Sequence, residues 1–301
     1  MMEVDFKKTY YNHLSDNIDV ISSVENYRLK SLLKVLCVSL FFFFCACFVL
    51  VVICLMVLNR EYNPFLFPIF LFLLYIFSLK SITGVILADR KFQQKFNEKI
   101  LPLLLEPVAN FKKWPKNKNT DVIVDSMLFP NFDTQEDDFS VFGYYKSISI
   151  TISDTRITLP VKASGKPDIF KGIIIQADLE KYIKNHVILI SKNEYKNNPY
   201  KAIKTNVEDM NENLYTFVQN DSAITFLNEK FWEIVKKIAS AYSAKSFSFS
   251  YKNEKMLIAM KQRKAMPFGY IFKSLKNPKN YDEFIEKLIV IYEIVDYMNN
   301  N

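Results

Sequence analysis

The chain has 301 residues, half of them hydrophobic, and a formal net charge of +7. Its basic residues are scattered among acidic ones rather than gathered in a stripe, a pattern that argues against nucleic acid as a partner. The rest of the sequence has no thiol for a zinc site, a disulfide framework or a catalytic nucleophile, because one apolar segment holds Cys37, Cys45, Cys47 and Cys54.

That apolar segment covers residues 35–58, which carry no charge and a single hydroxyl, that of Ser39. At about 1.5 Å per residue it forms a helix of roughly 36 Å, enough to cross a hydrocarbon core of about 30 Å. It lacks the polar stripe of a soluble surface helix. We therefore predict a first transmembrane helix over residues 35–58, preceded by a cytoplasmic segment over residues 1–34.

A second apolar stretch follows after a connection that is too short to recross a membrane. Residues 65–79 are uncharged, and residues 81–88 continue the apolar pattern beyond Lys80. The pattern predicts a second transmembrane helix over residues 62–88 and an antiparallel helical hairpin. Lys80 has two interpretations: an interfacial lysine that snorkels to the head groups, or an ion or proton site within the membrane.

The distribution of lysine and arginine predicts the orientation of the hairpin. Basic residues flank it on both outer sides, Arg28, Lys30 and Lys34 before the first helix and Arg90 and Lys91 after the second, whereas the connecting loop has only one arginine. The positive-inside rule then places both termini in the cytoplasm. The soluble part, residues 89–301, is predicted to be a cytoplasmic α+β domain, which makes the chain multi-pass.

A helical stripe continues behind the second predicted span. Phe92, Phe96, Ile100 and Leu104 recur at steps of four, which predicts a helix that Pro102 and a second proline then end.

The next segment has two open interpretations. It combines an aromatic residue with lysines close behind a membrane span, so its residues could contact anionic head groups; equally, the segment could be a solvated loop. The residues concerned are Lys112, Lys113, Trp114 and Lys116.

The apolar period then changes from about four to two, which predicts strands. Residues 148–152 and 157–161 are predicted as two strands around a turn at residues 153–155, and residues 169–177, 187–190 and 215–218 as three more. A late hairpin is predicted from residues 247–251 and 256–260, with its turn at residues 252–255.

Two helices complete the soluble part. The first follows Asp221 or Ser222 as the N-cap and has an apolar stripe from Leu227 to Ala241. The second has its stripe over residues 284–298. Strands and helices occur in runs rather than in strict alternation, which favours the α+β class.

The sequence contains one acidic cluster and no recognisable catalytic or nucleotide motif. Carboxylates crowded in a loop can bind a divalent cation, and they also form ordinary solvated loops; the cluster consists of Asp133, Glu136, Asp137 and Asp138. The five glycines are not spaced to hold a phosphate, and the two histidines lie far apart in the chain. We therefore expect no cofactor.

Four short segments resemble a known family in their order and spacing. They lie at residues 126–130 (Ser-Met-Leu-Phe-Pro), 170–178 (Phe-Lys-Gly-Ile-Ile-Ile-Gln-Ala-Asp), 217–222 (Phe-Val-Gln-Asn-Asp-Ser) and 246–259. The chain resembles a bacterial family of two-pass membrane proteins defined only as domain of unknown function 3137. It departs from that family at residues 136–139, where relatives have Gly-Glu-Asp. The resemblance implies a bacterial inner (plasma) membrane setting, and the family has no established activity to transfer.

Three functions follow as hypotheses. The first is a membrane-anchored scaffold or interaction module, in contact with the lipid bilayer, whose cytoplasmic domain binds a protein partner. The second is a membrane-bound enzyme that uses the acidic cluster or Asp178. The third is a component of an oligomeric transport assembly, since two spans could line a path only as an oligomer.

Overall fold

The computed structural model describes residues 2–58, 66–109, 112–113, 120–129, 132–158, 168–191, 201–207, 212–218, 226–262 and 273–300. The chain forms two compact units. The helical unit comprises Leu14–Leu103 and Gly269–Asn280. The sheet unit comprises Met1–His13, Leu104–Phe268 and Tyr281–Asn301.

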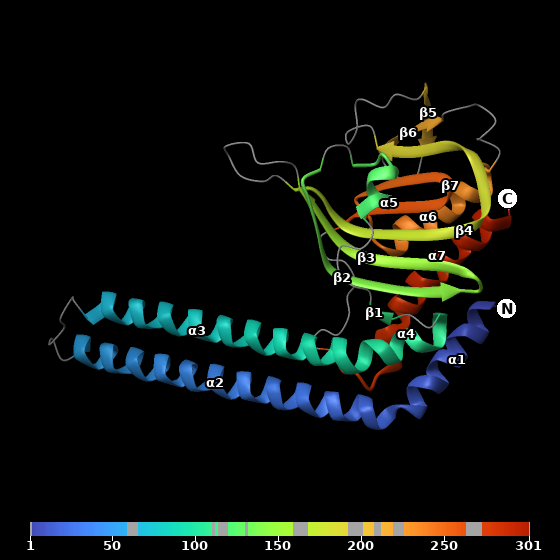
Figure 1. Cartoon of the computed structure of the whole chain (residues 1–301). Helices are drawn as coiled ribbons and strands as arrows, with labels where there is room; N and C mark the ends of the chain where they lie inside the picture. Colours follow the sequence, from blue (N-terminus) through green and yellow to red (C-terminus); the bar gives the residue numbers. More distant parts are fainter. Residues whose placement is uncertain are drawn as a thin grey trace. The chain divides into compact units, whose positions relative to one another are not determined.

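Two long helices dominate the helical unit. They are α2 (Ile18–Leu58) and α3 (Leu66–Lys95), which lie side by side (Figure 1). They run in opposite directions, because Tyr27 near the start of α2 lies under the ammonium group of Lys95 at the end of α3. The segment before residue 35 is also helical, with α1 over Met2–Asp16 and the first part of α2. The residue pattern before residue 35 did not predict these helical turns.

The stripe predicted behind the second apolar stretch is confirmed, whereas the predicted effect of Pro102 is wrong. Phe92, Phe96, Ile100 and Leu104 are all fully buried. A π-helical turn (Phe96–Ile100) links α3 to α4 (Leu101–Ala109). Pro102 therefore follows the π-helical turn within one uninterrupted helical course, which continues to Ala109.

The sheet unit contains a seven-stranded sheet in the described part of the chain, and every pair of strands is antiparallel. Its order is β1-β2-β3-β4-β6-β5, and β7 also pairs with β4 (Figure 1). The strands are β1 (Lys112–Lys113), β2 (Thr134–Tyr145), β3 (Ile148–Thr158), β4 (Asp168–Ser191), β5 (Lys201–Val207), β6 (Glu212–Val218) and β7 (Ser246–Lys261). The 24-residue β4 is central, since β3 and then β6 pair along one edge and β7 pairs along the other.

The turn predicted at residues 153–155 is wrong, because β3 continues through it. The hydroxyl groups of Ser153 and Thr155 lie 2.9 Å apart, and Thr155 donates to the carboxylate of Asp137 on β2 at 2.8 Å. These turn-forming residue types remain in the strand because neighbouring side chains satisfy their polar groups inside the sheet.

The late hairpin is also wrong, since β7 is one continuous strand. The predicted turn at residues 252–255 is exposed around Asn253, whose φ is +58°. The predicted gap between two strands at residues 178–186 lies opposite it within β4, where the register shifts twice. Both local signals therefore mark one irregularity shared by two long paired strands rather than two chain reversals.

Helices pack on the sheet and complete its cores. α6 (Glu229–Ala241) and α7 (Asp282–Asn300) pack against each other and against β7 and β4. Another cluster of buried side chains includes Ile123 of α5 (Thr120–Asp125) with Phe170, Ile174 and other strand residues. The N-cap of α6 is Asn228, whose side chain accepts from the Phe231 N–H; Asp221 and Ser222 lie outside the described residues. The α+β class is confirmed.

Candidate functional site

Large apolar side chains are exposed along α2 and α3. Phe44 and Phe48 of α2 are 65% and 70% exposed, and Phe72 of α3 is 62% exposed. Exposed apolar surface on this scale marks a contact with another protein or with lipid. One helix in the described part of the chain, Ile18–Val51 within α2, is long and apolar enough to cross a membrane, and its most apolar part is not buried.

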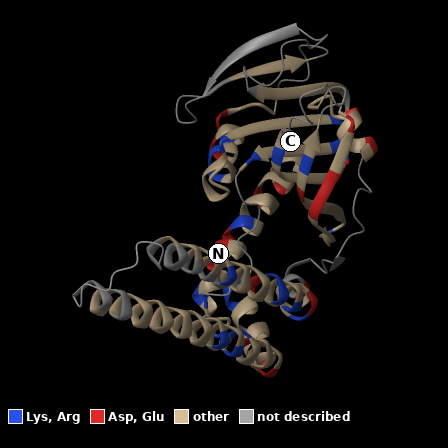
Figure 2. Ribbon diagram, turned by 90° about the vertical axis from the view of Figure 1, so that its left-hand side faces the viewer, with Lys and Arg blue, Asp and Glu red and all other residues tan. Residues whose placement is uncertain are grey.

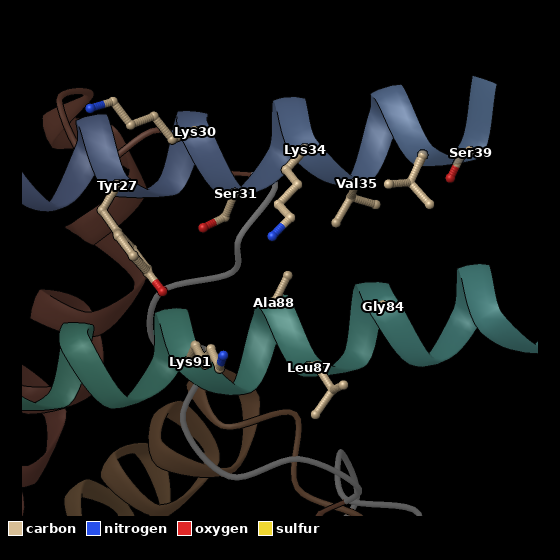
Figure 3. Close-up of a pocket in the computed structure, with 11 residues that line it drawn as sticks. Tyr27, Lys30, Ser31, Lys34, Val35, Ser39, Gly84, Leu87, Ala88 and Lys91 are labelled. Carbon is tan, nitrogen blue, oxygen red and sulfur yellow. The ribbon is translucent and has the colours of Figure 1, made fainter. Parts of the chain in front are cut away.

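A pocket opens between α2 and α3 where the charged part of each helix meets its uncharged part (Figure 3). Its volume is about 490 Å³, within the range of small-molecule sites. Lys30, Lys34 and Lys91 line it together with hydroxyl groups of Tyr27 and Ser31. We call this site the basic pocket.

The two ends of the basic pocket differ in chemistry. Lys34 points from α2 toward α3, and Tyr27 reaches toward the part of α3 that carries Lys91 (Figure 3). The lining beyond Lys34 is mainly apolar and includes Val38 of α2 and Leu87 of α3. Gly84 faces open space, because a Cβ added there would meet nothing within 4 Å. The pocket is therefore basic at one end and apolar at the other.

A buried ion pair lies on α2 where the basic pocket begins, since Arg28 stands between Tyr27 and Lys30 in the sequence. Glu25 and Arg28 are about 4% and 5% exposed, and two hydrogen bonds of 2.8 and 2.7 Å join them. Glu25 also accepts from the Ser274 hydroxyl and the Leu275 N–H, each at 2.9 Å. This carboxylate is committed to Arg28 and to a distant segment, so it does not neutralise the pocket lysines.

The sequence did not predict the basic pocket. Along the chain its lysines appear only as charges that flank two separate helices, where they predict the membrane orientation. Lys30 and Lys34 are four residues apart, and this spacing could have predicted a basic face on the helix that carries them. Figure 2 shows basic residues on the described parts of both units, so charge alone does not single out this site.

The acidic residues proposed for a metal site lie at and within the start of a strand rather than in a loop. Asp137 is buried on β2 and accepts hydrogen bonds from Thr155 and Gln135, whereas Glu136 and Asp138 are exposed. Asp133 is exposed just before the strand. Within the described ranges, no group of three His, Cys, Asp or Glu residues lies close enough to hold a metal ion.

The residues proposed to contact the membrane surface are only partly described. Lys112 and Lys113 form β1, which pairs with Phe142 and Val141 of β2, so this part of the segment is a short strand. Trp114 and Lys116 lie outside the described residues. The membrane contact of this segment stays a prediction.

His186 is a buried titratable group in the sheet unit. It is 1% exposed, and its Nε2 lies 2.9 Å from the hydroxyl of Ser250. Burial, with a smaller contribution from Lys252, lowers the pKa of His186 from 6.5 to about 4, against the opposing effects of the Ser126 backbone and Asp125. The folded protein therefore holds this imidazole neutral at neutral pH.

We predict that His186 makes the sheet unit acid-sensitive. As the pH falls from 6.5 toward 4, His186 binds a proton in the unfolded chain but stays neutral in the folded chain. The free energy of unfolding therefore falls by up to about 3 kcal/mol from this group. The unfolding midpoint of His186→Gln should therefore rise relative to that of the original chain as the pH falls through this window. Burial also raises the pKa of Asp154 to about 6, with the opposite sign, and subtracting the two curves removes that contribution. Parallel curves for the variant and the original chain would contradict the prediction.

The comparisons with known proteins give one family and two partial likenesses. Residues 168–300 match the family model described as "Protein of unknown function (DUF3137)". A protein of Dictyostelium discoideum described as an uncharacterized transmembrane protein is 31% identical over 74 residues, which span 25% of this chain and 24% of that protein. The crystal structure of the mycobacterial trehalose monomycolate transport factor A, TtfA, covers 62% of this chain and is itself covered to 88%, at 10% identity. Its TM-score of 0.37 does not establish a shared fold.

The family match bears out the resemblance seen in the sequence. Three of the four segments that carry the resemblance fall inside the matched range, and residues 126–130 precede it. The two-pass topology and the bacterial setting stay predictions, whereas α2 and the transmembrane relative both indicate membrane association. Residues 168–300 of this chain thus match a family that is known as a protein of unknown function (DUF3137).

Proposed function

We propose that the chain is a two-pass membrane anchor that carries an interaction domain on the cytoplasmic side, in a bacterial inner membrane. The observation that carries this proposal is the exposure of large aromatic side chains on both α2 and α3, among them Phe48 and Phe72. Exposing such a surface to water costs about 25 cal/mol for each Å² of apolar area, and this cost is absent when the surface lies in the hydrocarbon core of a bilayer. The two helices form a hairpin in this proposal, with Lys80 at the interface.

The sheet unit supplies the interaction domain in this proposal. Its paired strands β4 and β7 carry long runs of fully buried side chains, and α7 and α6 pack against them. The hydrogen bonds of Asp137 to Thr155 and Gln135 give that buried carboxylate a structural role. These contacts favour a binding module over an enzyme that uses the acidic cluster.

Native cysteine labelling tests the first membrane span without any substitution. All four cysteines lie in α2, so a membrane-impermeant maleimide should label less than about a tenth of them in sealed membranes, and should label them once detergent is added. The protein should also stay in the pellet after carbonate extraction. Labelling in sealed membranes, together with release by carbonate, would contradict the anchor.

Single cysteines placed in a cysteine-free variant test the topology. Glu61→Cys should react from outside in intact cells, whereas Lys255→Cys in the sheet unit should react only after the membrane is permeabilised. Lys255 is a suitable reporter because it is exposed on β7. Labelling of both from outside would mean a single crossing with the sheet unit outside, and labelling of neither would place the 59–65 connection inside.

In-cell crosslinking of the full chain tests the interaction role. Crosslinked peptides from a second protein should map to the sheet unit at near-stoichiometric yield, and a sheet-unit charge reversal at the crosslinked position should reduce that yield. Crosslinks only between copies of this chain would overturn the proposal and favour an oligomeric transport assembly.

A further inference from the structure

We infer that the basic pocket binds the head group of an anionic phospholipid, an inference that rests on the proposed membrane anchor. The observation that carries it is that Lys34 and Lys91, from two different helices, line the same pocket of about 490 Å³, whose other end is apolar. A phospholipid has the same division, an anionic phosphate joined to apolar chains. Basic pockets between membrane helices are the kind of site that holds such head groups.

The position of the pocket matches the depth at which a head group lies. Lys34 is the last charged residue before the uncharged run of residues 35–58, and Lys91 follows the uncharged part of α3 by a few residues. The pocket therefore spans the change from charged to apolar surface on both helices. A phosphate at the lysines would place its acyl chains along the exposed apolar side chains of the same helices.

The charge balance at the pocket calls for an anion. Lys34 and Lys91 line it together with Lys30, whose ammonium points away from α3 in Figure 3, and no carboxylate is among the described residues of its lining. The nearest buried carboxylate, Glu25, is held by Arg28, Ser274 and Leu275. Tyr27 and Ser31 add hydroxyl groups that can donate to phosphate oxygens. A zwitterionic head group would bring its own cation among the lysines and is therefore disfavoured.

The pocket also has room for the ligand at the level of Gly84. Gly84 lines the pocket, and a Cβ added at this position meets nothing within 4 Å. Gly84→Leu is therefore a variant that narrows the pocket and keeps every charge. Lys34→Gln/Lys91→Gln is the complementary variant that keeps the space and removes two charges.

Native mass spectrometry of the full-length protein in detergent tests the inference. With added phosphatidylglycerol we expect one retained lipid per chain, and with phosphatidylcholine at least tenfold less. The double lysine variant should bind phosphatidylglycerol roughly thirtyfold more weakly, from the contribution of each lysine near an anionic surface. Gly84→Leu should also lose the lipid, whereas Lys99→Gln, which removes one charge from the same unit outside the pocket, should bind like the original chain.

The outcomes separate this inference from the proposed anchor. Equal binding of the two lipids, or unchanged binding by the double lysine variant, would overturn the lipid site while carbonate extraction still supports the anchor. Displacement of phosphatidylglycerol by millimolar inorganic phosphate or glycerol phosphate would assign the pocket to a soluble phosphate compound instead. Release of the protein by carbonate would overturn the anchor itself.

Discussion

Gly172→Ala is expected to destabilise the sheet unit by about 3 kcal/mol or more, with a fall of roughly 6–12 °C in its unfolding midpoint. Gly172 lies on β4, where it pairs with Thr155 of β3 and with Lys261 of β7. An added Cβ would lie 2.0 Å from the carbonyl oxygen of Met260 and 2.9 Å from its carbonyl carbon. Both atoms belong to the backbone of the neighbouring strand, so no side-chain rotation can relieve the clash.

Gly84→Ala is the matched control for this substitution. It makes the same chemical change at a helical position where the new methyl group meets nothing within 4 Å. We expect no loss of stability, since alanine favours a helix over glycine. Thermal unfolding followed by circular dichroism, with both variants in the same detergent, makes the comparison. An unchanged midpoint for Gly172→Ala would show that β4 and β7 lie farther apart than in this structure.

Glu25→Gln is expected to destabilise the helical unit by about 3–5 kcal/mol, because it removes the carboxylate charge that pairs with the buried guanidinium of Arg28. The same carboxylate accepts from the Leu275 N–H, so the segment that carries Leu275 should loosen as well. Hydrogen–deuterium exchange should then rise in the peptide covering residues 273–280. Exchange in β4 should stay unchanged, since that strand belongs to the sheet unit.

A second substitution tests whether the charge is the cause. Arg28→Met removes the cation that pairs with Glu25, so the double variant Glu25→Gln/Arg28→Met should lose less stability than the sum of the two single variants. Glu98→Gln, which alters an exposed carboxylate of the same unit that accepts from Gln94, should leave the exchange of residues 273–280 unchanged. If the stability losses of Glu25→Gln and Arg28→Met simply add in the double variant, Glu25 and Arg28 act independently.

Local sequence patterns predicted β3, β4, β6 and β7 better than the ends of these strands, and they predicted neither β2 nor β5. The alternation of isoleucine with serine and threonine predicted β3, and the apolar run after Ile169 predicted β4. The turns predicted at residues 153–155 and 252–255 were wrong because residues that favour turns can also be accommodated inside a strand. The hydroxyl of Thr155 donates a hydrogen bond to Asp137 on the neighbouring strand. Asn253 has a positive φ, and β4 shifts its register at the position where it pairs with Asn253.

For the candidate sites, too, nearness in the sequence was a poor guide to nearness in the fold. The acidic residues from Asp133 to Asp138 stand together in the sequence, but a strand sends alternate side chains to opposite faces, so Asp137 is buried and its neighbours are exposed. The basic pocket shows the converse. Its lysines come from two helices that only the pairing of α2 with α3 brings together.

The sequence by itself determined that this chain carries an apolar helix able to span a membrane and an α+β domain after it. Both follow from properties that are read along one dimension, namely the length of an uncharged run and the period of apolar residues. Only the tertiary structure decided that Glu25 holds Leu275, that Gly172 faces the backbone of Met260, and that Lys34 and Lys91 share a pocket. Each of these depends on which distant segments lie beside one another, and that is settled by how apolar surfaces and polar groups are jointly satisfied across the fold.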